Sequence, residues 1–531
     1  MLFFCCCNIL QIAKNIRTNE IEKEMLSRVW SATIIGIEGV KVGVEVDVSG
    51  GLPKTTVVGL PDTAVQESRE RVKAALKNSG FAFPVRQITI NLSPADLRKE
   101  GPIFDLPISI GILAASEQVD PTYLEQFLFL GEVSLDGSLR AIAGVLPMAV
   151  TASKLGFKGI VVPKDNAQEA SVVEQIEVYG LNNINEVADF LQNPSAFSPT
   201  IPELNFDDSF HQSNYNLRDV KGQHHARRAL EIAAAGGHNL IFVGPPGAGK
   251  TMLARRMASI LPPLSFSEAL EVSQIYSVAG LLKNQGKLIQ ERPFRSPHHS
   301  ASGVALVGGG SFPKPGEISL SHRGILFLDE LTEFKRSVLE FLRQPLEDGF
   351  VTISRARQSV AFPAQFTLVA STNPCPCGYY GDTIQPCSCS PRQREQYWAK
   401  LSGPLLDRID LQVVVSRLKP EEMTQQKVGE DSEVVKERVA KARIKAQNRF
   451  HNAKISCNAQ MRSQHLREYC SLDDTSRTLL ENAIRKLGLS ARAMDRILKV
   501  SRTIADLAGE NNIQPPHIAE AIQYRTIDRM Q

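Results

Sequence analysis

The sequence predicts a multidomain α/β protein whose central domain holds a doubly wound parallel sheet. The chain has 531 residues, which at roughly 150 residues per domain is too long for one hydrophobic core. Its middle part alternates short apolar segments with helical patterns, a spacing typical of parallel strands joined by helices. Its last part is charged and helix-periodic, which predicts a helical domain after the sheet.

Domain limits follow from changes in composition along the chain. Residues 25–195 interleave alternating apolar segments with helical patterns, which predicts an α+β domain. Residues 196–215 are rich in Pro, Ser, Asn and Asp without a sustained period, and we interpret them as a linker. We expect the parallel-sheet domain over 216–418 and the helical domain over 419–531. The strands of the sheet domain are expected at 239–243, 324–328, 365–370 and 411–415.

Residues 1–24 precede the first domain and contain an apolar stretch of about nine residues. No basic segment comes before this stretch and no small-residue cleavage site follows it, which argues against a secretory signal. The sequence also lacks a run of about 18 apolar residues that could cross a bilayer. We therefore expect a cytoplasmic protein with no membrane partner. The extension is either a mobile tail or a segment ahead of the true translation start at Met25.

Bulk charge does not identify a partner. The 60 Lys and Arg residues against 57 Asp and Glu give a net charge of +3, too small to indicate nucleic-acid binding by itself. The aromatic content of 6% is that of an ordinary soluble α/β protein. Any basic binding surface therefore has to be local.

A phosphate-binding loop is predicted at residues 244–251, which match the pattern G-x-x-x-x-G-K-[ST]. The loop follows an apolar strand and precedes a helical pattern, which is the context that the motif requires. In such a loop backbone N–H groups turn towards the phosphates, Lys250 reaches the β- and γ-phosphates, and Thr251 supplies a hydroxyl to Mg²⁺. A Gly-rich turn without a ligand is the alternative. The residues expected to hold ATP are Gly244, Pro245, Pro246, Gly247, Ala248, Gly249, Lys250 and Thr251.

Two further apolar segments end in residues suited to ATP hydrolysis. The first ends in Asp329 and Glu330, where Asp329 is expected to hold Mg²⁺ and Glu330 to polarise the attacking water. The second ends in Asn373, whose amide is placed to orient water against the γ-phosphate. Taken alone, an acidic pair after a strand is often a helix cap, and an Asn is often a turn residue. Their order behind the phosphate-binding loop favours catalytic roles.

Longer segments of the chain resemble a known family. The ordered set of motifs resembles an AAA+ ATPase of the helix-2-insert group. The segments FRSPHHSASGVALVGGGSFPKPGEISLSHRGILFLDE, NPCPCGYYGD and LSGPLLDRID resemble the magnesium-chelatase-like ComM/YifB family. The resemblance covers residues 29 to 527.

The resemblance implies roles for several residues and for the whole chain. It makes Asn373 the sensor-1 residue, Arg408 an arginine finger offered to a neighbouring subunit, and Arg492 the sensor-2 residue, with Arg496 as the alternative to Arg492. Taken alone, each arginine is equally suited to a surface ion pair. An arginine finger that acts in a neighbouring subunit implies a ring. By resemblance to the family, this ring is a hexamer. The family also implies helicase-like branch migration of single-stranded or branched DNA in natural transformation.

The same resemblance implies a Lon-protease-like fold for the first domain, without the catalytic pair of that protease. Ile103 stands where the Lon nucleophile would be, and Leu146 stands where the Lys would be. Neither side chain can attack a carbonyl or take up a proton. We expect a non-proteolytic domain used for docking or for gripping a polymer. Ser93 and Ser109 lie nearby in sequence, but serines near loops are usually structural.

A metal site is predicted between residues 375 and 389, where two C-x-C pairs flank a turn-rich segment. The four cysteines are Cys375, Cys377, Cys387 and Cys389. A structural zinc bound by four thiolates is the expected occupant, with free buried thiols and redox chemistry as the alternatives. Because the cluster begins two residues after Asn373, it is placed to brace the loop that reads the γ-phosphate. The adjacent His298 and His299 have no evident third metal ligand, and we interpret them as polar loop residues.

A β-hairpin is expected at residues 349–362, ahead of the strand that ends in Asn373. Apolar and polar residues alternate on both sides of Arg355 and Arg357, which places the arginines at the hairpin tip. There they are candidates for DNA phosphate contacts, or for ion pairs with nucleotide or a neighbouring carboxylate. A DNA motor is the leading hypothesis, because the family resemblance implies one. A chelatase-type ATPase that remodels a protein partner is the alternative, and the loss of the Lon catalytic pair disfavours an ATP-dependent protease.

Overall fold

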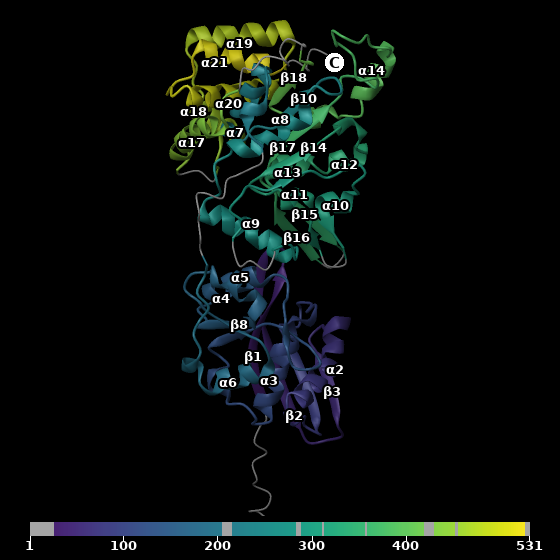
Figure 1. Cartoon of the computed structure of the whole chain (residues 1–531), viewed down its shortest axis with the longest axis vertical. Coiled ribbons are helices and arrows are strands. Elements are labelled where there is room, and N and C mark those ends of the chain that lie inside the picture. Colours follow the sequence, from purple (N-terminus) through teal and green to yellow (C-terminus); the bar gives the residue numbers. More distant parts are fainter. Residues whose placement is uncertain are drawn as a thin grey trace, which may run out of the picture. The chain divides into compact units, whose positions relative to one another are not determined.

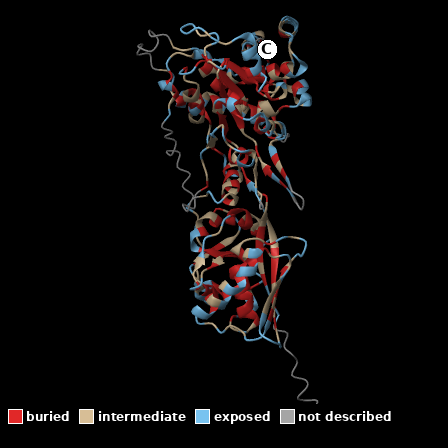
Figure 2. Ribbon diagram, turned by 90° about the vertical axis from the view of Figure 1, so that its right-hand side faces the viewer, coloured by how far each residue is buried: buried red, intermediate tan, exposed pale blue. Residues whose placement is uncertain are grey.

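The computed structural model describes residues 26–203, 215–282, 288–310, 313–355, 358–418, 429–451 and 455–525. The chain forms two compact units. The N-terminal unit comprises Met1–Asn205 and Tyr276–Leu288, and the C-terminal unit comprises Phe206–Ile275 and Ile289–Gln531. Each unit has its own buried core, drawn in red in Figure 2.

The N-terminal unit is built on a seven-stranded sheet of order β3-β4-β2-β1-β5-β8-β9. The sheet is mixed, because β1 pairs antiparallel with β2 and parallel with β5. Its strands are β1 (Leu26–Ile35), β2 (Glu38–Ser49), β3 (Lys54–Val58), β4 (Gln87–Ser93), β5 (Phe127–Phe129), β8 (Gly159–Pro163) and β9 (Glu177–Leu181), with a separate ribbon of β6 (Glu132–Val133) and β7 (Leu139–Arg140). Its helices are α2 (Thr63–Asn78), α3 (Asp105–Ala115), α4 (Val145–Lys154), α5 (Lys164–Ser171) and α6 (Ile184–Gln192). This arrangement confirms a mixed α/β unit.

Hydrophobic patterning explains how this unit forms its core. Alternate residues of β2 are buried valines, because successive side chains of a strand point to opposite faces of the sheet. Helix α3 is apolar on all sides and buried along its whole length, as expected of a helix in the centre of a domain. Its first residue, Asp105, is a buried carboxylate that lies 2.9 Å from the guanidinium of Arg71. This pairing offsets the cost of burying the charge.

The C-terminal unit contains a five-stranded sheet of order β11-β14-β17-β10-β18, and all neighbouring strands are parallel. The strands are β10 (Leu240–Val243), β11 (Phe294–Arg295), β14 (Ile325–Leu328), β17 (Thr367–Thr372) and β18 (Leu411–Val414). The helices up to β18 are α7 (His224–Gly236), α8 (Lys250–Arg256), α9 (Phe266–Val278), α10 (Gly303–Val307), α11 (Glu317–Leu320), α12 (Arg336–Glu340), α13 (Arg343–Asp348), α14 (Pro391–Trp398) and α15 (Gly403–Leu406). The predicted parallel sheet is confirmed. The edge strand β11 was not predicted, because two residues carry no readable period.

Two short ribbons accompany this sheet. The first pairs β12 (Gly308–Gly309) with β13 (Lys314–Pro315). The second is the predicted hairpin, in which β15 (Phe350–Arg355) pairs antiparallel with β16 (Gln358–Pro363). Figure 1 shows the hairpin at the end of the C-terminal unit that lies away from its last helices.

The predicted C-terminal helical region is confirmed. Its helices are α17 (Ser432–Arg449), α18 (Ser463–Tyr469), α19 (Asp474–Leu487), α20 (Ala491–Leu507) and α21 (Pro515–Gln523). Polar residues begin three of them, since the side chains of Asp431, Asp473 and Ser490 accept hydrogen bonds from backbone N–H groups of the first turns. Helix α20 packs against α7, α17 and α21. Within the described ranges, no helix has the length and apolar character needed to cross a bilayer.

Candidate nucleotide-binding site

The predicted phosphate-binding loop joins β10 to α8. Only glycine fits at position 244, because a Cβ there would lie 2.1 Å from the carbonyl oxygen of Val415. Gly247 and Gly249 have φ angles of 77° and 84°, in the left-handed region that favours glycine. These conformations let loop N–H groups turn towards an anion at the N-terminus of α8.

The ammonium of Lys250 has three hydrogen-bond acceptors around the loop. It donates to the carbonyl oxygens of Gly244 at 2.7 Å and Pro245 at 3.0 Å, and to Oδ1 of Asn373 at 3.2 Å. Burial lowers the pKa of Lys250, although two nearby carboxylates oppose this effect. The three acceptors are neutral, so phosphate oxygens are suited to replace them around the ammonium. The tertiary structure therefore brings the loop lysine and Asn373 together.

Oxygen ligands suited to Mg²⁺ lie beside the loop. The hydroxyl of Thr251 donates to Oδ2 of Asp329 at 2.7 Å. The hydroxyl of Ser371, on β17, donates to Oδ1 of the same carboxylate. Hydroxyl and carboxylate oxygens are hard ligands of the kind that Mg²⁺ prefers, so this donor set fits the ion. Ser371 was not singled out by the sequence, because a serine inside an apolar strand gives no signal of its own.

Glu330 follows the strand β14 in an unusual backbone conformation. Its φ is 53°, in the left-handed region that is costly for residues other than glycine and is often found at functional sites. Its N–H donates to Oδ1 of Asp329 at 3.1 Å and to the hydroxyl of Ser371 at 3.4 Å. The side chain is 57% exposed, so its carboxylate is accessible to a water molecule. These features suit a general base.

His299 is a site residue that the sequence interpretation missed. Its Nδ1 lies 3.8 Å from Oε2 of Glu330. A pair of adjacent histidines in a loop carries no sequence signal for a contact with a carboxylate that lies distant in the chain. Within the described residues, the metal-ligand cluster found is the cysteine one and does not include either histidine.

Each of the three candidate arginines pairs with a carboxylate of this unit. Arg408 pairs with Glu347 and also donates to the carbonyl oxygen of Pro404 at 2.7 Å. Arg492 is 70% exposed and lies 3.3 Å from Oδ2 of Asp407. Arg496 is less exposed, and it lies 3.1 Å from the buried carboxylate of Asp410.

A buried polar network connects β18 with α20. Nδ1 of His238 lies 2.9 Å from Oδ2 of Asp410, and Nε2 of His238 lies 2.7 Å from the hydroxyl of Thr503. Burial alone would raise the pKa of Asp410, but the charge of Arg496 and the contact with His238 lower it below its usual range. The network joins the segment that carries Arg408 to the helix that carries Arg496. No local pattern indicates this network, because its members are distant in the chain.

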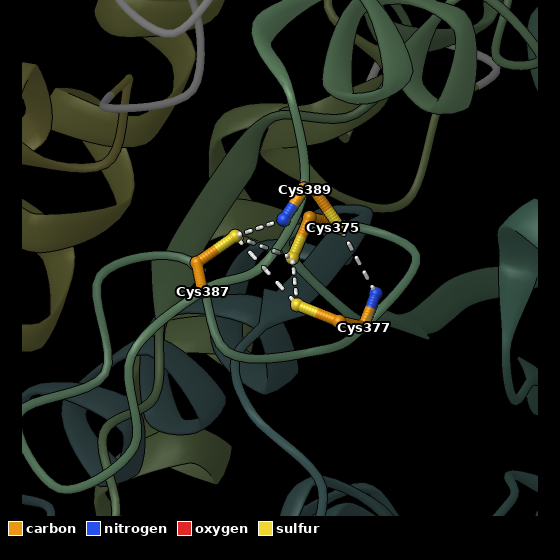
Figure 3. Close-up of side chains that lie close together, drawn as sticks. All are labelled: Cys375, Cys377, Cys387 and Cys389. Atoms are coloured by element: carbon orange, nitrogen blue, oxygen red, sulfur yellow. Dashed lines mark hydrogen bonds between the residues drawn. The ribbon is translucent and has the colours of Figure 1, made fainter.

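The four predicted cysteines meet in one cluster (Figure 3). Their sulfur atoms all lie within 4.8 Å of one another. The Sγ–Sγ distances are 3.3 Å between Cys375 and Cys377, 3.7 Å between Cys375 and Cys387, and 3.6 Å between Cys377 and Cys387. The backbone N–H of Cys377 points to Sγ of Cys389 at 3.4 Å. Four converging sulfurs are a donor set that fits a metal ion.

The cysteine loop packs directly against the phosphate-binding loop. A Cβ on Gly378 would lie 2.7 Å from Cδ of Pro246, so the cysteine loop packs at Gly378 against the ring of Pro246. Arg417 connects them a second time, because it donates to the carbonyl oxygen of Pro246 at 3.3 Å and lies 3.5 Å from Oδ2 of Asp382. The cysteine loop is therefore connected to Pro246 of the phosphate-binding loop both directly and through Arg417.

The positions related to a protease active site are filled by core side chains. Ile103 is 8% exposed and Leu146 is fully buried. Ser109 donates to the carbonyl oxygen of Asp105 at 2.7 Å, and Ser93 donates to that of Gly43 at 3.4 Å. Both serine hydroxyls are therefore engaged with the backbone.

The candidate DNA contacts are not described at the level of side chains. The backbone of Arg355 ends β15, opposite Gln358 on β16. Arg357 and the side chain of Arg355 lie outside the described residues. Their role stays a prediction.

Comparisons with known proteins agree with this architecture. Residues 216–423 match the family described as magnesium chelatase, subunit ChlI, residues 44–166 match subunit ChlI of Mg-chelatase, and residues 429–525 match the C-terminal part of that subunit. The chain is 48% identical to the competence protein ComM of Haemophilus influenzae, over 95% of this chain and 98% of that protein. It is 44% identical to the protein YifB of Salmonella typhimurium, again over 95% and 98%. Against the magnesium-chelatase subunit ChlI of Cyanophora paradoxa it is 26% identical, over 25% of this chain and 45% of that one.

The parallel sheet, the phosphate-binding loop and the matching families define an ATPase of the magnesium-chelatase-like AAA+ class. The near full-length similarity is more specific than this class. The chain belongs to the ComM/YifB family.

Proposed function

We propose that the chain is the subunit of an ATP-hydrolysing ring motor that moves on DNA and drives branch migration of recombination intermediates in natural transformation. The observation that carries the proposal is the assembled ATP site in a chain 48% identical, over 95% of its length, to a protein named for competence. The geometry of the phosphate-binding loop and its neighbours supports the proposed ATPase activity. The proposed action on DNA rests on the similarity to the competence protein and on the position of the β15–β16 hairpin.

In the proposed ATP site, the loop residues 244–251 surround the phosphates and Lys250 neutralises part of their charge. Thr251 and Asp329 hold Mg²⁺, which when bound withdraws charge from the phosphate oxygens. Glu330 removes the proton of the attacking water. Asn373 orients this water, and its contact with Lys250 keeps the amide directed towards the phosphate end of the site.

The ring is inferred from the environments of Arg408 and Arg492. Among the described contacts, Arg408 bonds to Glu347 and Pro404, and Arg492 bonds to Asp407, which precedes Arg408 in the chain. Neither pairing involves the phosphate-binding loop of the same chain. We infer that both arginines serve the nucleotide of a neighbouring subunit, in a ring that by family resemblance has six members. Guanidinium groups stabilise the charge that develops during phosphoryl transfer.

DNA contacts are assigned to the β15–β16 hairpin. Its second strand is followed within a few residues by β17, which leads to Asn373. One continuous segment thus connects the hairpin with Asn373, the residue proposed to orient the attacking water. Arg355 and Arg357 are the candidate contacts to DNA phosphates, and these contacts would change as ATP is hydrolysed.

The test is the ATPase rate of the full chain with and without single-stranded, double-stranded and branched DNA, beside a branch-migration assay. We expect stimulation by at least one DNA form and ATP-dependent migration, with Lys250→Ala inactive in both. If no DNA binds and none changes the rate, the DNA motor is rejected.

A chelatase-type ATPase that remodels a protein partner is the second candidate. The family matches favour it, since all three models are described as chelatase parts. Similarity to the magnesium-chelatase subunit ChlI of Cyanophora paradoxa covers only 25% of this chain, however, and similarity to that of Trieres chinensis covers 29%, whereas the similarity to the competence protein covers 95%. An ATPase that ignores DNA but responds to a protein would support this second function.

Zinc is the proposed occupant of the cysteine cluster. Four thiolates leave no open coordination position, which suits a structural ion and not a catalytic one. Because the cluster contacts the phosphate-binding loop through Gly378 and Pro246, its role would be to fix the shape of the loop next to the γ-phosphate.

A further inference from the structure

We propose that the N-terminal unit carries a second DNA-binding surface, on which the indole ring of Trp30 stacks against an unpaired base of a single strand. The surface consists of a cavity beside Trp30 and of the two lysines that line it, Lys41 and Lys158. The inference rests on the proposed action on DNA and adds a contact surface outside the β15–β16 hairpin. It starts from an aromatic side chain that the sheet leaves partly exposed next to a basic group.

Trp30 lies in the middle of β1, on a face of the sheet that is only partly covered. Its partner in register on β2 is Gly43. A Cβ on Gly43 would lie 3.2 Å from Cζ3 of the indole, so the absence of a side chain there leaves room for the ring. Nearer to the start of β2 the same face is covered by α4, because a Cβ on Gly39 would lie 2.7 Å from Oγ1 of Thr151. The helix ends at Lys154, and Trp30 stays partly exposed.

A surface cavity of about 340 Å³ opens beside the indole. Leu155 and Phe157, which follow α4 in the chain, line the cavity together with Trp30. Leu155 is 53% exposed, which is unusual for a large apolar side chain. The volume falls within the roughly 300–1,000 Å³ that small-ligand sites occupy, so the cavity has room for a base. Its apolar and aromatic walls suit the flat faces of a base.

The charge around the cavity is complementary to a phosphate backbone. Nζ of Lys41 lies 3.4 Å from the centroid of the Trp30 ring and 5.2 Å from that of Phe157. Within the described parts of the chain, the recorded contacts of this ammonium are with these two rings. Lys41 and Lys158 line the cavity, whereas Glu125 is the one carboxylate among the described residues that line it. The cavity therefore carries a positive balance and a lysine that is available to an anion.

A single strand of DNA matches this combination of an aromatic face and lysines. Every base has a π-face that stacks on an aromatic side chain, and the phosphates between the bases attract cations. The lysine ammonium ends a flexible four-carbon stem, so Lys41 can move from the indole to a phosphate when a base takes its place. In a duplex the bases are already stacked on one another. The surface therefore accepts the unpaired parts of a branched intermediate.

The test follows the fluorescence of Trp30 in the full chain, with a non-hydrolysable ATP analogue present throughout. The chain has two tryptophans, and the other one, Trp398, is 9% exposed and donates its indole N–H to the carbonyl oxygen of Pro374 at 3.0 Å. Trp398→Phe therefore leaves Trp30 as the reporter. We expect an oligothymidylate of about 15 nucleotides to quench this fluorescence, because a base stacks on the ring. A blunt duplex of the same length should not quench it.

Variants separate stacking from packing. Trp30→Leu keeps an apolar side chain beside Gly43 but has no aromatic face. Its affinity for oligothymidylate should fall by about 5- to 100-fold, while duplex binding and the thermal transition stay unchanged. Trp30→Phe should retain most of the affinity. Lys41→Gln should lower the slope of log affinity against log salt by about 0.7, and Lys77→Gln, an exposed lysine on α2, is the matched control that should not.

The outcomes distinguish this surface from the proposed motor. Quenching of Trp30 should persist in Arg357→Glu, because the hairpin is a separate contact. Oligothymidylate that binds without quenching Trp30, or that binds a folded Trp30→Leu variant normally, overturns the proposal and leaves the DNA motor standing. Quenching without DNA-stimulated ATPase or branch migration supports the surface and rejects the motor. If iodide quenches Trp30 and oligothymidylate does not, the exposed ring serves another partner, such as a protein, and the proposal is overturned.

Discussion

Arg408 and Glu347 form an ion pair that turns the predicted arginine finger towards its own chain. Glu347 lies in the last turn of α13, three residues before the hairpin strand β15 begins. The hydrogen bond from Arg408 lowers the pKa of Glu347, and the charges of Arg492 and Arg496 add to this effect. The carboxylate of Glu347, next to the hairpin, therefore interacts electrostatically with all three candidate arginines.

Arg408→Ala should abolish ATP hydrolysis and leave nucleotide binding intact, because the guanidinium acts on the ATP of a neighbour. Mixing Arg408→Ala with Lys250→Ala subunits should restore part of the activity, since each then supplies what the other lacks. Turnover and binding of a fluorescent ATP analogue would be measured. Glu347→Gln is the control, since it removes only the partner of the finger and should keep hydrolysis. Normal turnover of Arg408→Ala would show that the finger is assigned wrongly.

Glu330→Gln should bind ATP and Mg²⁺ normally and hydrolyse ATP at least about 100-fold more slowly, because an amide of the same shape cannot take up a proton. The protein should then accumulate in the ATP-bound form, which single-turnover measurements with radiolabelled ATP would detect. Asp329→Asn is the comparison, because it should weaken Mg²⁺ binding as well. Wild-type turnover of Glu330→Gln would move the catalytic base elsewhere.

The purified protein should carry about one zinc ion per chain if the four cysteines form a closed site. Metal analysis of protein prepared without chelator would measure this. Cys387→Ser should lose the metal and lower the ATPase rate, since the cysteine loop contacts Pro246. Cys470→Ala changes a buried cysteine outside the cluster and should keep the metal. Metal-free protein whose four cysteines are readily alkylated would contradict a metal site.

Arg357→Glu should weaken DNA binding and reduce its dependence on salt, while ring assembly and the ATPase rate without DNA stay unchanged. Each phosphate contact that is lost should lower the slope of log affinity against log salt by about one. DNA titrations at several salt concentrations would measure it. Arg477→Glu, an exposed arginine on α19, is the matched control and should bind DNA normally. Unchanged branch migration by Arg357→Glu would reject the hairpin as the DNA contact.

Asp410→Asn should lower the thermal transition of the C-terminal unit, because it leaves the partly buried Arg496 without its partner. Removing one member of a buried ion pair costs about 3–5 kcal/mol. Since the folded pKa of Asp410 is lowered, this stabilisation is complete above the unfolded value near pH 4 and is lost as the pH falls through the folded pKa. Calorimetry at neutral and acidic pH would measure both effects. Asp407→Asn, whose partner Arg492 is exposed, should change the transition little.

Sequence patterns predicted the features that depend on residues close together in the chain. The phosphate-binding loop, the four expected strands and the pair Asp329–Glu330 are local patterns of glycines, apolar periods and charges, and the parallel sheet then places their ends at one edge. The cysteine cluster was also predictable, because its four members lie within one short loop. The hairpin followed from alternation on both sides of Arg355.

The remaining relationships were decided by the tertiary structure alone. The contact of His299 with Glu330 depends on the register of an edge strand of two residues, which no periodicity can indicate. His238, Asp410 and Thr503 come from three distant segments, and Arg408 meets Glu347 although the two are 61 residues apart in the chain. The sequence by itself determined which chemical groups the chain carries and which local elements present them. Which of these groups meet depended on strand pairing and helix packing, because contacts between distant segments follow from burial of the whole core and leave no local pattern.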